Sequence, residues 1–206
     1  MKRISILIFA VLLLFTCIMP AFAAETTSDV QSDEDAAMIT QDEQPSASTS
    51  LIVYFSHTGN TLELAKHIQE LTGAETFKIE PVILYPEVYE ECVSQARAEL
   101  ADEAFPQISK HVDDIASYDI IYLGYPIWIG TIPRPVATFL VEHDLEGKTI
   151  IPFCTYGGGG ISNSVTDILD LVPQAIVKEA FGVTGTRAAE AKDAVSEWLK
   201  ELDREE

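Results

Sequence analysis

Short, continuous apolar runs alternate with segments of helical periodicity from residue 51 to residue 206. Uninterrupted runs of aliphatic and aromatic residues are typical of strands that are covered on both faces of a sheet. They predict five strands, at residues 51–55, 76–79, 120–124, 149–154 and 175–177. Pro152 lies inside the fourth run, which is unusual for an interior strand because proline has no N–H to donate to a neighbour.

Apolar residues spaced three and four positions apart predict helices between and after these runs, at residues 62–71, 87–104, 136–141, 161–171 and 188–202. Parallel strands joined by right-handed helical crossovers form a sheet with helices on both faces. The predicted fold class is therefore α/β, with a doubly wound five-stranded parallel sheet. Ligands bind such sheets beyond the carboxyl ends of the strands, where the winding reverses, so the segments after strands one, three and four are the candidates.

The segment after the first strand is rich in groups that bind phosphate. Hydroxyl groups, an amide and a glycine turn directly precede a predicted helix, whose N-terminus attracts anions. No Lys or Arg is present, so neutral donors and the helix dipole would meet the negative charge. The alternative is an ordinary turn before a well-capped helix, but six adjacent residues suited to one task favour a phosphate site: Ser56, His57, Thr58, Gly59, Asn60 and Thr61.

The segment after the third strand places large apolar side chains in a predicted loop, where they need something flat and apolar to cover. A flavin ring is such a surface, and aromatic stacking adds about 0.5–1.5 kcal/mol beyond area burial. Gly124 and Gly130 are expected to let the backbone approach the ring. Packing of Trp128 into the core or against a partner is the alternative. The candidate residues are Pro126, Ile127, Trp128, Ile129 and Gly130.

The segment after the fourth strand contains four successive glycines, residues 157–160. Between a buried strand and a helix, such a run indicates backbone pressed against a ligand rather than a linker. Tyr156 or the glycine N–H groups would contact the polar edge of that ligand. The candidate residues are Thr155, Tyr156, Gly157, Gly158 and Gly159.

These three segments together resemble the cofactor loops of the flavodoxin family. The first is similar to its Ser-x-Thr-Gly-Asn-Thr loop for the phosphate of flavin mononucleotide (FMN), and the second to the Pro-Ile-Trp-aromatic-Gly loop of one subgroup, with Ile129 where a second Trp is common. The resemblance covers residues 51–203 and includes Tyr85, Pro86, Tyr89 and Cys92. It implies strand order 2-1-3-4-5 and FMN bound without a covalent link.

The same resemblance implies a function in electron transfer, because the flavin performs the chemistry and the protein sets its potential and access. No residues form a nucleophile–base pair, so we expect a carrier that meets redox partner proteins. An FMN-dependent NAD(P)H or quinone reductase, and a flavin-binding module without turnover, remain alternatives. No metal site is expected, because the histidines are far apart in sequence, at positions 57, 67, 111 and 143.

Charge narrows the range of partners. Residues 51–206 hold 26 acidic and 11 basic residues, a net charge of −15, which argues against nucleic acid and against anionic membrane surfaces. Cys92 and Cys154 lie within apolar helical and strand patterns, so buried free thiols are expected rather than a disulfide.

The N-terminal residues have the pattern of an exported protein. Lys2 and Arg3 precede an apolar run and the small-residue triplet Ala21–Ala23, which predicts a signal peptide at residues 1–23. An uncleaved anchor or lipid attachment at Cys17 is the alternative, and either would be the protein's only membrane contact. Residues 24–50 are acidic, lack aromatic residues and predict a disordered tether before the domain at 51–206.

Overall fold

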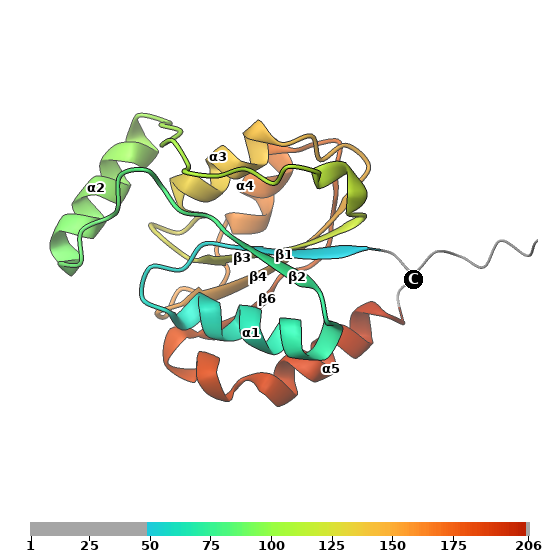
Figure 1. The fold of residues 1–206 in the computed structure, drawn as a ribbon. Coiled ribbons are helices and arrows are strands. Elements are labelled where there is room, and N and C mark those ends of the chain that lie inside the picture. The colour runs from blue at the N-terminus through green and yellow to red at the C-terminus, as the bar shows by residue number, and fades with distance from the viewer. Residues whose placement is uncertain (1–48, 205–206) are drawn as a thin grey trace, which may run out of the picture. The chain divides into compact units, whose positions relative to one another are not determined.

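The computed structural model describes residues 49–204, which form a parallel sheet with helices on both faces (Figure 1). The predicted signal peptide at 1–23 and the tether as far as residue 48 lie outside the described residues. The elements in chain order are β1 (Ser50–Tyr54), α1 (Asn60–Thr72), β2 (Glu75–Lys78), α2 (Tyr89–Ala101), η1 (Ile115–Ser117), β3 (Ile120–Pro126), α3 (Arg134–Glu142), β4 (Thr149–Tyr156), α4 (Ser164–Leu171), β5 (Ile176–Val177), β6 (Phe181–Thr184), η2 (Gly185–Glu190) and α5 (Lys192–Leu202).

The sheet has the order β2-β1-β3-β4-β5 with every pair parallel, which confirms the predicted doubly wound topology. Helices α1 and α5 lie on one face, and α3 and α4 lie on the other (Figure 1). The winding reverses between β1 and β3, which are adjacent in the sheet but far apart in the chain. A crevice for a ligand is expected at this point.

The fifth position of the sheet differs from the prediction, because two short strands occupy it. β5 pairs with Thr149 and Ile150, whereas β6, which the sequence analysis missed, pairs with residues 153–156. Pro152 lies between these two regions of β4 and has no N–H to donate. The break in the edge strand therefore coincides with the residue that cannot continue the ladder. The chain after β5 returns to the sheet as β6, whose carboxyl end lies beside that of β4.

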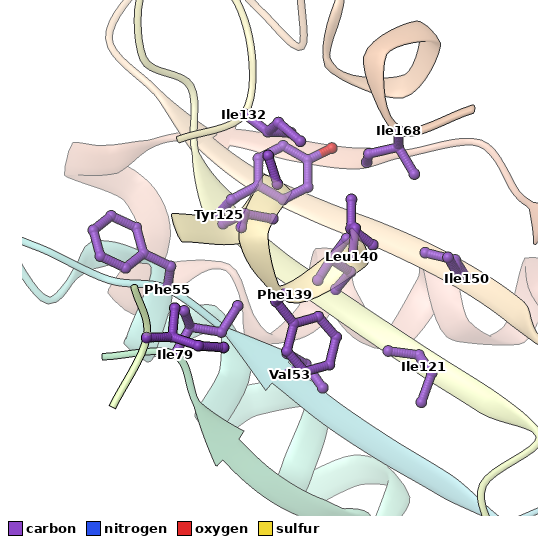
Figure 2. Packing of buried hydrophobic residues seen from close by; sticks show 14 of the residues in the cluster. Val53, Phe55, Ile79, Ile121, Tyr125, Ile132, Phe139, Leu140, Ile150 and Ile168 are labelled. Atoms are coloured by element: carbon purple, nitrogen blue, oxygen red, sulfur yellow. The ribbon is translucent and has the colours of Figure 1, made fainter. Parts of the chain in front are cut away.

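Alternation along β1 supplies both halves of the core. Leu51, Val53 and Phe55 pack on the side of α3 and α4, while Ile52 and Tyr54 pack on the side of α1 and α5. Figure 2 shows the first cluster, in which residues from the strands meet Phe139 and Leu140 of α3. Because both faces of the strand are buried, the sequence shows a continuous apolar run rather than an alternating one.

Helix α2 lies apart from both helical layers, at the side of the molecule where α1 begins (Figure 1). Its position is fixed by side-chain contacts. The Tyr85 hydroxyl donates to the Glu99 carboxylate, and Arg134 donates to the carbonyl oxygens of Ala104 and Glu103, with the Nη2–O distance to Glu103 at 3.0 Å. Within residues 49–204, no helix is long and apolar enough to span a membrane.

Candidate functional site

A cavity of about 460 Å³ lies where β1, β3 and β4 end. Its volume falls within the range of about 300–1,000 Å³ that is usual for small-molecule and cofactor sites. Most of the candidate residues line it: His57, Thr58, Asn60, Pro126, Ile127, Trp128, Ile129, Thr155, Tyr156 and Gly157. The other candidates belong to the same segments but do not line it: Ser56, Gly59, Thr61, Gly130, Gly158 and Gly159. Pro126, Thr155 and Tyr156 lie at strand ends rather than in loops, because β3 and β4 each run two residues further than predicted.

The N-terminus of α1 lies at this cavity, and its N-cap residue makes no side-chain hydrogen bond. Gly59 is the N-cap residue, with φ of 91° in the left-handed region that glycine adopts without steric cost. It has no side chain with which to satisfy the first N–H groups of the helix. The Asn60 amide donates to the Thr58 hydroxyl across 3.3 Å, and both residues line the cavity. The helix end therefore presents neutral donors and a positive dipole to a ligand.

Thr61 has a different place from the one that the sequence suggested. Its hydroxyl lies 2.9 Å from that of Thr155, and the two residues are only 1% and 3% exposed. The Ser56 hydroxyl accepts the N–H of Leu62 at 3.2 Å. Of the three hydroxyls in the first segment, only that of Thr58 therefore lines the cavity, while Thr61 ties α1 to β4.

Trp128 lies in a group of aromatic side chains at the cavity wall. Its ring centroid is 4.8 Å from that of Tyr85, 5.4 Å from that of Phe55 and 5.7 Å from that of His57, all in edge-to-face geometry. Contacts of this kind hold the indole in one orientation. Trp128 therefore presents a rigid apolar surface, although stacking on a ring stays a prediction.

The backbone next to Trp128 forms a tight turn with two left-handed residues. Ile129 has φ of 50° and Gly130 has φ of 80°, and the N–H and carbonyl groups of Trp128 and Thr131 bond each other at 3.0 Å. This is the pattern of a type I′ hairpin turn. A β-branched residue with positive φ is strained, and such strain is concentrated at functional sites. Ile129 is 42% exposed and lines the cavity, so the strain holds an apolar side chain at its edge.

The glycines around the cavity do not share one purpose. A Cβ added at Gly157 or Gly158 would meet no atom within 4 Å, so packing inside the protein does not require glycine there. At Gly124, a Cβ would lie 2.2 Å from the Phe153 ring on the neighbouring strand. Packing against Phe153 therefore accounts for glycine at position 124, which does not line the cavity, and the approach of its backbone to a ring stays a prediction.

Two parts of the cavity wall were missed by the sequence analysis. Helix α2 contributes Tyr89, Cys92, Val93 and Ala96, and the end of β6 contributes Thr184, Gly185 and Thr186. The latter segment has the hydroxyl-and-glycine composition of the first segment and directly follows a strand. That signal was present, but it was overlooked because β6 was not predicted.

The cavity lining carries little charge, and the thiols at or near it are protonated. Among the described residues that line the cavity, Glu87 is the one acidic residue, and none is Lys or Arg. Burial and the nearby Glu99 charge raise the pKa of the Cys92 thiol, which therefore stays protonated at neutral pH. Cys92 and Cys154 are buried free thiols as predicted, and burial raises the pKa of Cys154 to about 12. Residues 49–204 contain no group of three or more His, Cys, Asp or Glu side chains placed to hold a metal ion.

A doubly wound sheet of this order, with a helix N-terminus and an aromatic wall at its switch point, defines a flavin-type mononucleotide-binding protein. Residues 49–202 match the family model described as flavodoxin, and the chain belongs to the flavodoxin family. The cofactor of flavodoxin is FMN, bound at the switch point between the first and third strands.

Several solved structures are similar to this chain. Proteins described as flavoproteins from Bacteroides eggerthii and Bacteroides uniformis are both 30% identical, with TM-scores of 0.62 and 0.67, and the matches cover 73% and 74% of this chain and 99% and 98% of theirs. A flavoprotein from Lactobacillus acidophilus in complex with FMN is 22% identical, with 73% of this chain and 99% of that chain covered and a TM-score of 0.58, and supports the fold. A search of curated proteins gave no match.

The residues that line the cavity fit FMN by their chemistry. Thr58, Asn60 and the start of α1 supply neutral donors for a phosphate, which a helix N-terminus binds readily. Ile127 and Trp128 supply an apolar wall for a ring, and the space beside Gly157 is open to a ligand.

Proposed function

We propose that this chain binds FMN non-covalently in the cavity and carries electrons between redox partner proteins outside the cytoplasm. The observation that carries the proposal is the pairing of a neutral phosphate-binding end with an aromatic wall at the switch point of the sheet. Either feature alone occurs in many folds. Their meeting in one cavity matches a planar ring linked to a phosphate.

The side chains of the cavity have distinct tasks in this proposal. When bound, FMN supplies one- and two-electron chemistry. Thr58, Asn60 and the N–H groups at the start of α1 hold the phosphate, and Trp128 covers the ring and excludes water. Thr61 and Thr155 keep the phosphate end and the ring end in fixed relation through their buried hydrogen bond.

The acidic surface favours a carrier, and the cavity lining gives no sign of nucleophilic catalysis by a cysteine. Acid–base and nucleophilic catalysis use groups whose pKa values are tuned toward neutrality, whereas a flavin accepts hydride from NAD(P)H without such a group. Cys92 has a raised pKa, which leaves the thiol protonated and weakly nucleophilic. The acidic surface, with a net charge of −15 over residues 51–206, supports encounter with a basic partner.

Titration with flavins tests the cofactor. Protein freed of flavin should bind FMN with quenching of flavin fluorescence and should bind riboflavin more weakly, because riboflavin lacks the phosphate. Protein that stays colourless after incubation with FMN would end the proposal.

Stopped-flow mixing with NAD(P)H tests the carrier against the reductase. Without a partner protein, a carrier should show slow flavin reduction, whereas its electron transfer with a basic partner should slow as salt rises. Rapid flavin reduction by NAD(P)H alone, at a rate that does not depend on salt, followed by turnover with a small quinone, would contradict the carrier. It would indicate an FMN-dependent reductase.

The location is tested by the mature N-terminus. The signal-peptide pattern at residues 1–23 supports export, with cleavage after Ala23. Sequencing of the natively produced protein should begin at Ala24. A lipid-modified start at Cys17 would instead mean a membrane-attached protein, and an intact Met1 in the cytoplasm would contradict export.

A further inference from the structure

The segment after β1 supplies fewer hydroxyl donors to the phosphate end of the cavity than its sequence predicts. Thr61 bonds Thr155 in the protein interior, and Ser56 accepts the N–H of Leu62 outside the cavity lining. A phosphate group has three strong acceptor oxygens. None of the described residues that line the cavity is Lys or Arg, so neutral groups from another segment would add to the Thr58 hydroxyl, the Asn60 amide and the N–H groups at the start of α1.

A segment about 125 residues beyond Asn60 in the chain lies at the phosphate end of the cavity. Thr184, Gly185 and Thr186, here called the Thr184 segment, run from the last residue of β6 into η2 and line the cavity. The Thr184 and Thr186 hydroxyl oxygens lie 3.5 Å apart, at the limit of a hydrogen bond, so the two hydroxyls are neighbours. The segment is joined to α1, because η2, which begins at Gly185, packs against that helix.

Gly185 brings the two segments into direct contact. A Cβ at this residue would lie 2.7 Å from Asn60 Nδ2 and 3.3 Å from Asn60 Cγ, closer than side chains pack. The same Asn60 amide donates to the Thr58 hydroxyl at 3.3 Å. Glycine at position 185 therefore allows the Asn60 amide to keep its place between the two segments.

We propose that the Thr184 segment forms the second wall of the phosphate site and that the Thr184 and Thr186 hydroxyls select FMN over riboflavin. This inference rests on the proposed function, since it assigns residues to the same cavity. The phosphate is held between Thr58 and Asn60 on one side and the two hydroxyls on the other. All of these donors are neutral, so the positive end of α1 supplies the favourable electrostatic potential.

Flavin titrations of the full chain, purified without flavin, test this assignment. The double variant Thr184→Val, Thr186→Val removes both hydroxyls with little change in side-chain volume. FMN affinity should fall at least about tenfold, since a hydrogen bond to a charged group contributes that much or more. Riboflavin affinity should stay within about twofold. The double variant Thr184→Ser, Thr186→Ser keeps both hydroxyls and should keep the preference for FMN. Thr76→Val, at an exposed position of the edge strand β2, is the control.

Gly185→Ala gives an independent measurement if the double variant does not fold. Its Cβ displaces the Asn60 amide, so FMN should again be weakened and riboflavin should not. Equal losses for FMN and riboflavin would show a purely structural role and overturn the inference, as would unchanged FMN affinity in both variants. A wild-type chain that binds neither flavin would refute the proposed function itself. A wild-type chain that prefers FMN, with variants that do so equally, would refute only the role of the Thr184 segment.

Discussion

Residues with the same side chain differ in purpose around the cavity, and the surroundings of each decide which. Gly124 makes room for Phe153 inside the sheet, whereas Gly157 borders open space in the cavity. Gly59 and Gly130 adopt positive φ, which a residue with a side chain would resist. Substitution by alanine therefore distinguishes three kinds of glycine that the sequence presents alike.

Gly157→Ala should weaken flavin binding without weakening the fold. Its Cβ would meet no protein atom within 4 Å, but it would project where the ring is expected. Overpacking of this kind costs about 1–3 kcal/mol, so FMN and riboflavin affinity should each fall about tenfold, measured by fluorescence titration.

Gly158→Ala is the matched control, because Gly158 has equal room but does not line the cavity. Urea unfolding should give the same stability for both variants. Unchanged flavin affinity in Gly157→Ala would place the ring away from the glycine segment.

Trp128 should report flavin binding directly. The second tryptophan, Trp198, stacks on Phe181 with ring centroids 5.0 Å apart and does not line the cavity. In a Trp198→Phe protein, emission from Trp128 should therefore be strongly quenched when FMN binds. In the reciprocal Trp128→Phe protein, emission from Trp198 should change less. Unaltered Trp128 emission at saturating FMN would mean that the indole does not contact the ring.

At the scale of elements, α3 and the segment before η1 are joined by a histidine that must be neutral. His143 Nδ1 donates to the Phe139 carbonyl at 2.8 Å, and His143 Nε2 accepts the N–H of Val112 at 3.1 Å. Burial lowers the pKa of His143, assisted by His111 and opposed by Glu142 and by the bond to Phe139. A second proton on the ring would occupy the nitrogen that accepts from Val112.

Stability should therefore fall as the pH drops below about 6.5, the unfolded pKa of histidine. The lowered pKa means that the unfolded chain binds the proton more tightly, so this contribution is complete above that value and lost toward the folded pKa. The loss is on the order of 1 kcal/mol, the net value of one hydrogen bond.

Urea unfolding at pH 7.5 and 5.5 measures the loss. His143→Gln should show a smaller difference between the two pH values than the wild type. His111→Gln controls for the neighbouring pair of His111 and Glu142, whose side chains lie 2.8 Å apart. An equal loss in the wild type and His143→Gln would assign the pH dependence to other groups.

At the scale of the whole molecule, an acidic domain binds a cofactor that is itself an anion. The net charge of −15 over residues 51–206 repels the FMN phosphate over long range, while the local donors are neutral. Screening shortens this repulsion from about 30 Å at 0.01 M salt to about 8 Å at 0.15 M.

FMN affinity should therefore rise with salt over this interval. Riboflavin has no phosphate, so its affinity should change much less, and fluorescence titration of the two flavins separates the effects. Use of both NaCl and KCl controls for binding of a particular ion. A fall in FMN affinity with salt would indicate a cationic partner for the phosphate and contradict a site built from neutral donors.

The amino-acid sequence determined the features that depend on neighbours in the chain. Both faces of the central strands are buried, so their apolar runs predicted the strands and, with the helices between them, a doubly wound parallel sheet. The confirmed strand order was what the resemblance to flavodoxins implied. The carboxyl ends of β1, β3 and β4 could be located for the same reason, and most of the candidate residues there line one cavity.

The tertiary structure alone decided which groups meet across the chain. Thr61 bonds Thr155, a residue 94 positions away, so its hydroxyl is buried, although its motif is that of a phosphate loop. β6 joined the sheet beyond the break at Pro152, and this brought Gly185 against Asn60. Periodicity reports which face of an element is buried, but partners distant in sequence are set by strand order and by packing between elements. That is why the fold and three cavity segments followed from the sequence, whereas the α2 wall, the Thr184 segment and the role of each hydroxyl required the structure.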